Sequence, residues 1–218
     1  LRLAREHLVE GSIFFARADD ESPRAFSPRR WKRDPASLFL FMAFVRRFSF
    51  GLFGVFIPVY LVSQVGLSAG QTGVFHGITK FALALTILLS GGLADAWGRK
   101  PLLVLSGLSF LAPALLVLFP TTAGVTAAVL IQGVTVGFFN PVAVIYLADF
   151  APPEQRGSYQ GQLAGISALS SLAGPVIGGF MADLVGLSAV FLTGAVGIAL
   201  TVPLAALLAE SAGRAREN

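Results

Sequence analysis

The sequence predicts an all-α membrane protein with six transmembrane helices, arranged as two inverted three-helix repeats. Of its 218 residues, 55% are hydrophobic and only 13% are charged, whereas a soluble domain carries about 25% charged residues. The mean hydropathy is +0.75. The apolar residues gather in six runs, each close to the roughly 20 residues that a helix needs to cross a bilayer. These runs lack the alternating pattern of a transmembrane β-barrel.

A polar N-terminal region, residues 1–36, precedes the first apolar run and is expected to be cytoplasmic and partly disordered. Its first stretch, LRLAREHLVEGSIFF, is compatible with a short amphipathic helix on the membrane surface. The basic cluster RRWKR, residues 29–33, is interpreted as a positive-inside anchor. Binding to anionic lipid is the alternative role for this cluster.

Capping residues and prolines set the limits of the predicted helices. The first segment opens with Asp34 as N-cap and Pro35 at the first helical position. The second follows a capping box that runs from Ser68 to Gln71. Pro152 and Pro153 stop the fourth segment. The predicted segments cover residues 37–62, 71–93, 101–119, 124–150, 158–184 and 188–208, within a bundle over 37–210 that a C-terminal cytoplasmic tail, 211–218, follows.

The positions of Lys and Arg predict how the helices are oriented. Apart from Arg46, Arg47 and Lys80, every Lys and Arg lies in the N-terminal region, after the second or fourth segment, or in the C-terminal tail. Because Lys and Arg bias loops to the cytoplasmic side, both termini are expected there. A short echo, GGLADAWG at 91–98 and GGFMADLVG at 178–186, supports the inverted repeat, which is a transporter architecture.

Three motifs together resemble those of a known family. The connection after the second segment matches G-x-L-A-D-R-x-G-R-K-x-x-L at Gly91, Leu93, Ala94, Asp95, Gly98, Arg99, Lys100 and Leu103, with Ala96 in place of the first base. PPEQRG at 152–157 and GPVIGG at 174–179 are similar to the helix 4–5 loop and to the helix 5 antiporter motif of the same family. On these residues the chain resembles the N-terminal six-helix half of the major facilitator superfamily.

The resemblance implies a secondary transporter that moves a small solute by alternating access. The helix 5 motif, Gly174, Pro175, Gly178 and Gly179, favours efflux of a drug-like compound or metabolite, with a proton as the candidate coupling ion. In the helix 4 antiporter pattern Val129 stands where an arginine is usual, although Gln132 and Gly133 are kept. Pro175 is expected to bend helix 5 and shape gating. Glycine pairs four residues apart permit close helix crossings: Gly133 and Gly137, Gly161 and Gly165, and Gly174 and Gly178.

The connection after the second segment is expected to act as a gate. Asp95 lies near the C-terminal end of its helix, where the helix dipole opposes a carboxylate. The resemblance implies a latch on the cytoplasmic side, in which Asp95 meets a helix N-terminus of the opposite half and a nearby arginine such as Arg99. The predicted gating motif comprises Gly91, Asp95, Gly98, Arg99, Lys100 and Arg156.

Lys80, inside the second segment, is a candidate for the substrate or ion pathway, because an ammonium group in hydrocarbon costs about 2.5–3.5 kcal/mol on insertion scales. His76 lies four residues earlier on the same helical face. A structural pair is the alternative for both residues. Arg46 and Arg47 are adjacent and point about 100° apart. We therefore expect one of them to face the cavity and the other the membrane interface.

Gln132 and Asn140 are further pathway candidates on the fourth segment, which lines the cavity in the family that the chain resembles. Asn140 either binds substrate or bonds a carbonyl that Pro141 frees. Because several pathway candidates are cationic, an organic anion is the alternative substrate. Basic residues gather at the ends of apolar runs, which indicates topology and not binding to nucleic acid.

No Ser/His/Asp set, metal cluster or nucleotide-binding loop is visible in the sequence, so neither an enzyme, nor a cofactor, nor a metal is expected. A full member of the family has twelve helices in the bilayer. The absence of an initiator Met and the abrupt C-terminal tail favour a fragment, with a second six-helix half or a homodimer partner to complete it. A non-transporting half-size scaffold is the rival function. The expected location is the inner or plasma membrane.

Overall fold

The computed structural model describes residues 35–151 and 153–208, and all regular structure within these ranges is helical. Of the predicted tails, 1–36 and 211–218, all but residues 35 and 36 lie outside the described residues, as does the proposed N-cap Asp34. Six stretches are long and apolar enough to cross a membrane, as the sequence predicts. They are Pro35–Ser63, Ala69–Trp97, Arg99–Leu118, Thr122–Phe150, Pro153–Val185 and Leu187–Ala206.

Three of the six spans consist of two helices, and one more opens with a 3₁₀ turn. The elements are α2 (Pro35–Gly54), α3 (Ile57–Ser63), α4 (Ala69–Trp97), α5 (Arg99–Gly107), η2 (Leu108–Phe110), α6 (Leu111–Leu118), α7 (Thr122–Phe150), η3 (Pro153–Gln155), α8 (Arg156–Val185), α9 (Leu187–Ala199) and α10 (Thr201–Ala206). Pro58, Pro113 and Pro203 each lie in the second helix of a divided span. Because proline lacks the N–H that would bond the preceding turn, it favours such breaks. Pro141 and Pro175, by contrast, lie inside continuous helices.

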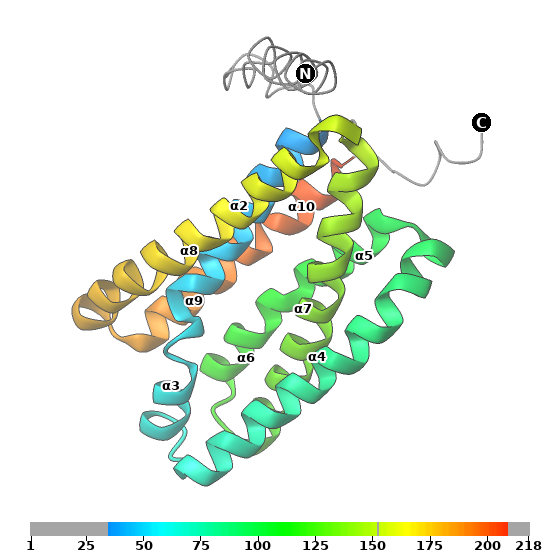
Figure 1. Cartoon of the computed structure of the whole chain (residues 1–218). Coiled ribbons are helices and arrows are strands. Elements are labelled where there is room, and N and C mark those ends of the chain that lie inside the picture. The colour runs from blue at the N-terminus through cyan, green and yellow to red at the C-terminus, as the bar shows by residue number, and fades with distance from the viewer. Residues whose placement is uncertain (1–34, 152, 209–218) are drawn as a thin grey trace, which may run out of the picture. The chain divides into compact units, whose positions relative to one another are not determined.

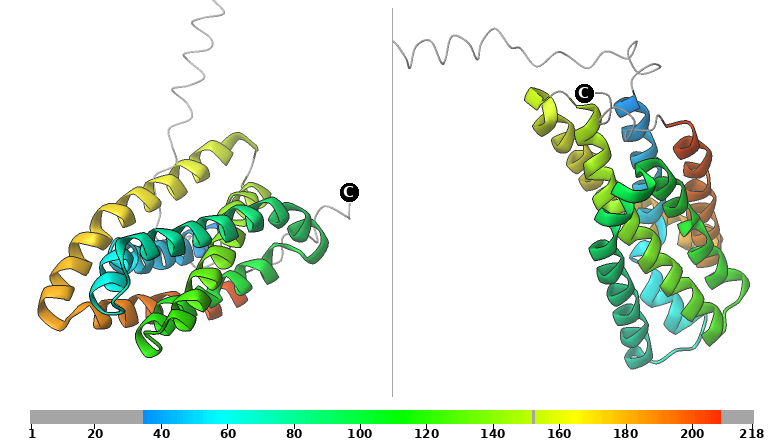
Figure 2. Two further views of the ribbon diagram at one scale, coloured as in Figure 1. Left: turned by 90° about the horizontal axis from the view of Figure 1, so that it is seen from below. Right: turned by 90° about the vertical axis from the view of Figure 1, so that its right-hand side faces the viewer.

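Two helix pairs form the framework of the bundle: α2 lies against α8, and α4 against α7 (Figure 1). The turned views in Figure 2 show the same pairing of α4 with α7. Glycines permit both contacts. A Cβ on Gly174 would lie 2.7 Å from the Gly51 Cα, and one on Gly133 would lie 2.6 Å from the Thr79 carbonyl oxygen. Close backbone approach of this kind is how membrane helices gain packing energy.

The repeated GG…G sequences end α4 and α8 in the same way. Gly98 and Gly186 have φ values of 89° and 86°, and their N–H groups donate to the carbonyls of Ala94 and Ala182. Positive φ is accessible to glycine without strain. In both places the next helix begins at the residue after the glycine. The loops that the sequence predicted at 94–100 and 185–187 are therefore helical except at Gly98 and Gly186. The capping box between Ser68 and Gln71 is confirmed, and it starts α4 at Ala69.

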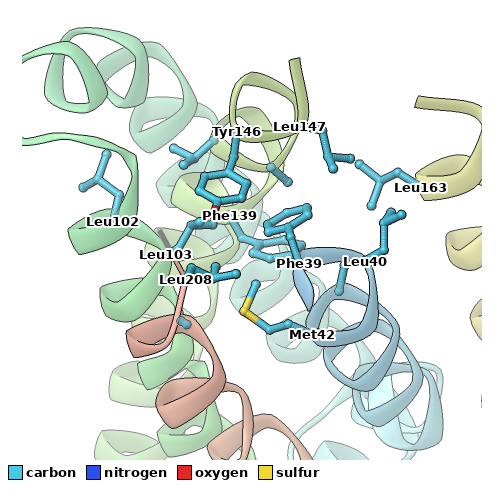
Figure 3. Close-up of a cluster of buried hydrophobic side chains, with 14 of the residues drawn as sticks. Phe39, Leu40, Met42, Leu102, Leu103, Phe139, Tyr146, Leu147, Leu163 and Leu208 are labelled. Carbon is cyan, nitrogen blue, oxygen red and sulfur yellow. The ribbon is translucent and has the colours of Figure 1, made fainter. Parts of the chain in front are cut away.

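Two apolar clusters occupy different levels of the bundle. Figure 3 shows the first, in which Phe39 stacks beside Phe139 and Tyr146 at ring-centroid distances of 6.4 and 5.0 Å. The second is built from α2, α3, α6, α7 and α9 around Phe53, Tyr60 and Phe191. Buried polar residues of α2 and α7 fall between the cluster residues along each helix, among them Arg46 and Gln132. This polar level is where the candidate site lies.

Candidate functional site

A cavity of about 480 Å³ lies among α2, α4, α7 and α8, with η2 and α9 closing part of its wall. Sites for small molecules have volumes of about 300–1,000 Å³. The arginines of the cavity lie inside their membrane span, since Arg46 lies about 16 Å along the helix from Pro35 at 1.5 Å per residue. Its lining includes all the pathway candidates from the sequence: Arg46, Arg47, His76, Lys80, Gln132 and Asn140.

Arg46 and Arg47 both face this cavity, and they share one aromatic partner. The guanidinium carbons lie 4.4 Å and 5.7 Å from the centroid of the Phe139 ring. The expectation that only one of the two faces the cavity was therefore wrong. The physical reason is that the long arginine side chains reach the ring from adjacent positions, since a cation–π contact extends to about 6 Å.

Arg46 is only 6% exposed, yet it makes no hydrogen bond or ion pair within the part of the chain that the structure describes. The Arg47 Nε is also buried without a hydrogen-bond partner there. The ring of Phe139 is thus the main compensation for the buried charge of Arg46 and the half-buried charge of Arg47. Such compensation is partial, because a guanidinium normally satisfies its N–H groups with oxygen acceptors.

His76 and Lys80 approach the cavity from α4, four residues apart on one face. Both residues are exposed in this six-helix unit. They also line a second, largely apolar cavity of about 260 Å³, which adjoins the first. The two cavities share six lining residues: Phe50, Gly54, Val55, His76, Lys80 and Gln132. The positive and apolar compartments therefore form one continuous site.

The buried hydroxyl and amide side chains of the bundle fall into two groups, those that bond their own helix and those that have no partner among the described residues. Ser49, Thr86 and Thr135 donate to a carbonyl of their own helix at 2.6–2.8 Å, which satisfies each hydroxyl. The Ser109 Oγ and Gln132 Oε1 atoms have no such partner, although both residues line the cavity. A buried polar atom without a partner is destabilising. Both atoms are therefore unsatisfied within the described helices.

Asn140 lies on α7 at the cavity wall, directly before Pro141. No hydrogen bond links its side chain to a carbonyl within residues 35–151 and 153–208, so the structure gives no sign of the carbonyl-satisfying role. Next to it, Phe139 is a site residue that the sequence did not reveal. It is one of 19 phenylalanines in an apolar chain, and no local pattern marks it as the ring beneath two arginines.

The helix 5 motif GPVIGG divides between packing and the cavity. Gly174 and Gly178 press against the backbone of α2 at Gly51 and Leu52, which leaves no space for a side chain. Pro175 lines the cavity, and Gly179 has only an ordinary contact with Phe56. The predicted crossing at Gly161 and Gly165 is not present, because neither has a neighbour within 4 Å.

Arg99 joins the end of α4 to the end of α7. Its Nη2 lies 3.5 Å from the Asp95 Oδ1, and its Nε lies 3.2 Å from the Asp149 Oδ2. The Nε–H is not aimed at an acceptor, so the contact with Asp149 is an ion pair without an aligned hydrogen bond. The Asp149 side chain is 32% exposed and that of Asp95 is 78% exposed. Solvent therefore screens the ion pair of Arg99 with Asp149 less than it screens the ion pair of Arg99 with Asp95.

Asp149 is the second site residue that the sequence reasoning missed. A signal was present, since it is the only carboxylate in the apolar run that ends at Phe150. Its place in the last turn of α7 puts it where the helix dipole opposes a negative charge, as for Asp95 on α4. Arg99 therefore compensates two carboxylates, each at the C-terminal end of its helix.

The other residues of the predicted gating motif form no ion pair among the described residues. Gly98 provides the turn, and Gly91 and Lys100 are half-buried. Arg156 opens α8 and is exposed. The structure thus brings together Asp95, Gly98 and Arg99, and it adds Asp149, but it gives no contact that includes Arg156.

Residues 39–218 match the family model described as Major Facilitator Superfamily. The chain belongs to this superfamily. Membership assigns the chain to transport proteins and not to enzymes, in agreement with the sequence analysis. Together with the six apolar spans, it makes the chain an integral, multi-pass protein of the plasma membrane.

Curated relatives of the chain include drug-resistance proteins. The multi-drug resistance efflux pump PmrA of Streptococcus pneumoniae is 32% identical over 167 residues, which are 74% of this chain and 41% of the pump. The methylenomycin A resistance protein of Streptomyces coelicolor is 36% identical over 124 residues, 54% of this chain and 26% of that protein. The chain therefore spans less than half the length of these relatives.

Solved structures of two superfamily transporters share the fold. The POT family transporter PepTSo superposes with a TM-score of 0.71 at 16% identity, covering 88% of this chain and 38% of that one. The human organic anion transporter MFSD10 gives 0.67 at 18% identity, covering 85% and 49%. At these identities the likeness concerns the arrangement of helices.

Proposed function

We propose that the chain forms the N-terminal six-helix half of a secondary active transporter, which exports a drug-like compound or metabolite by alternating access. The observation that carries the proposal is the convergence of polar side chains from α2, α4 and α7 on one cavity. Charged residues within membrane helices are expensive and typically mark substrate or ion pathways. The names of the two resistance proteins described above support export as the direction.

A second six-helix half, or a second copy of the chain, would complete the cavity. The exposed face of α4 supports this part of the proposal: Phe81 and Leu88 are 73% and 80% exposed beside the exposed Lys80. An apolar helix face of this kind packs on lipid or on another helix, while Lys80 needs a polar environment. Burial of α4 against a partner would supply the polar environment that Lys80 needs.

The ion-paired residues around Arg99 are proposed as one side of a gate. Asp95 is largely exposed while its neighbour Arg99 is held by Asp149. An exposed carboxylate is able to accept hydrogen bonds from a helix N-terminus of the opposite half. Formation and release of that contact would accompany rocking between the two access states.

A proton is the coupling ion that we propose for the cycle. Carboxylates are absent from the described lining of both cavities, and His76 is the proton carrier in this proposal, because histidine side chains serve as proton shuttles in proteins. Its neighbours in the cavity are the cationic Lys80, Arg46 and Arg47.

Export from efflux-deficient bacteria that express the complete coding sequence tests the proposal. Cells are loaded with fluorescent drug-like compounds, and the rate of loss is measured for wild type and Asp95→Asn. We expect export by wild type and slower export by Asp95→Asn at equal amounts of membrane-inserted protein. A purified protein that is monomeric and inert in liposomes would instead support the non-transporting scaffold.

A further inference from the structure

We propose that the cavity binds an amphipathic organic anion, with its anionic group at Arg46 and Arg47 and its apolar body in the adjoining apolar cavity. The inference rests on the proposed transport function and names the substrate class of the same site. Carboxylate and phosphonate groups are the simplest anionic ends that suit a pair of arginines, because the planar guanidinium fork matches their two oxygens.

The first argument is the charge of the site. Two guanidinium groups lie against one ring, and Lys80 lines the same space. Like charges this close repel one another, and a bound anion removes the repulsion. Arg46 is 6% exposed and has no ion pair within the described chain, so its N–H groups are available to an acceptor.

The second argument is the position of the negative charges. The carboxylates among the described residues are Asp95, Asp149, Glu154 and Asp183, and all of them lie at or near helix ends. None of them lines either cavity. The described helices therefore offer no counter-ion for Arg46 or Arg47, and the ligand supplies one in this proposal.

The third argument is the division of the site into two ends. Beyond the shared residues, the smaller cavity is lined mainly by apolar side chains, including Phe53, Leu61, Leu116 and Val129. The larger one is lined by both arginines and by the polar residues Ser109 and Asn140. A ligand with a charged end and an apolar body fits both compartments at once, whereas a hydrophilic anion would leave the apolar cavity unfilled.

Calorimetric titration of the purified 218-residue chain tests the proposal. The chain is held in nanodiscs of zwitterionic phosphatidylcholine and titrated with 4-phenylbenzoate and with its methyl ester, which has the same apolar body but no charge. Empty nanodiscs correct for partition into lipid. We expect the carboxylate to bind about tenfold more tightly than the ester, as for a lost charge-assisted hydrogen bond.

Three variants assign the binding to the arginines. Arg46→Met and Arg47→Met are expected to lower the affinity for the carboxylate about tenfold while the affinity for the ester stays constant. Arg46→Lys, which keeps the charge but loses the planar fork, should retain part of the preference. Arg24→Met removes the same charge outside the described helices and is the control, with wild-type affinities expected.

Three outcomes would overturn the proposal. Equal affinity of wild type for carboxylate and ester shows that the arginines have no free capacity for an anion. Absence of carboxylate binding would also overturn the proposal. So would a preference for the carboxylate over the ester that persists in both Met variants.

The titration is repeated with phosphatidylglycerol in the nanodiscs, where an unchanged affinity for the carboxylate supports a soluble anion as the ligand. Loss of binding there assigns the site to a lipid headgroup.

The export assay separates this inference from the proposed function. Selective binding of the carboxylate by a protein that exports nothing would refute the transport function and leave the binding site intact. Export of uncharged compounds by a protein that binds carboxylate and ester equally would refute the substrate class and leave the transport function intact.

Discussion

The Arg46 guanidinium carbon lies 4.4 Å from the centroid of the Phe139 ring, and the two residues are only 6% and 2% exposed. This contact joins α2 to α7 at the wall of the cavity. The ring face attracts the cation, and Phe39 stacks with the same ring at a centroid distance of 6.4 Å within the first apolar cluster. A charge in the membrane interior is thereby held at a fixed place without an acidic partner from the described helices.

A double-mutant cycle between Arg46→Met and Phe139→Leu should give a coupling energy of about 0.5–2 kcal/mol, the range for cation–π contacts. The measurement is the free energy of unfolding in mixed micelles. Phe138→Leu is the matched control, because Phe138 belongs to the same cluster at 8% exposure and has no arginine over its ring. Coupling to Arg46 as strong at Phe138 as at Phe139 would contradict the assignment.

Asp149→Asn should loosen the junction of α4, α5 and α7, because Arg99 loses its less exposed partner. We expect faster amide hydrogen exchange in the first turn of α5 and a loss of stability of less than about 1 kcal/mol, as for partly exposed ion pairs. The loss should shrink at high salt. Asp183→Asn is the control, since Asp183 likewise lies in the last turn of its helix, α8, and has no ion pair among the described residues. Equal effects of the two variants would refute the role of Asp149.

Gly174→Ala should destabilise the bundle, because the new Cβ would lie 2.7 Å from the Gly51 Cα and force α2 away from α8. Gly165→Ala on the same helix meets nothing within 4 Å. There the higher helix propensity of alanine, worth up to about 1 kcal/mol, should leave stability unchanged or raised. Thermal unfolding in detergent compares the two variants. A Gly174→Ala protein as stable as the Gly165→Ala protein would show that the close crossing is not required.

The predicted orientation is testable because the chain has no cysteine. Thr121→Cys and Ser158→Cys place a single thiol at opposite ends of α7, before and after the helix. If the basic connections are cytoplasmic, a membrane-impermeant maleimide should label Thr121→Cys in intact cells. Ser158→Cys should be labelled only after the cells are permeabilised. The reverse pattern would show that the helices are inverted.

Hydropathy and glycine patterns were sufficient to predict the six helices, the capping box before α4 and the family. Helix limits were less predictable, because a single glycine at positive φ replaces a loop at Gly98 and Gly186. The pathway residues were found because a polar group within an apolar run is visible in the sequence. Their partners were not, because Phe139 and Asp149 meet Arg46 and Arg99 only through the packing of helices distant in sequence.

Thiol accessibility inside the cavity tests the central claim most directly. Asn140→Cys lies at the cavity wall, and Ala143→Cys lies one turn away on α7, where Ala143 is 0% exposed. Each variant is treated with anionic and cationic methanethiosulfonate reagents, and the rates are divided by those for a free thiol. If the cavity is hydrated and positive, Asn140→Cys should react far faster than Ala143→Cys and should favour the anionic reagent. Equally slow reaction at both positions, or a preference for the cationic reagent, would contradict the account.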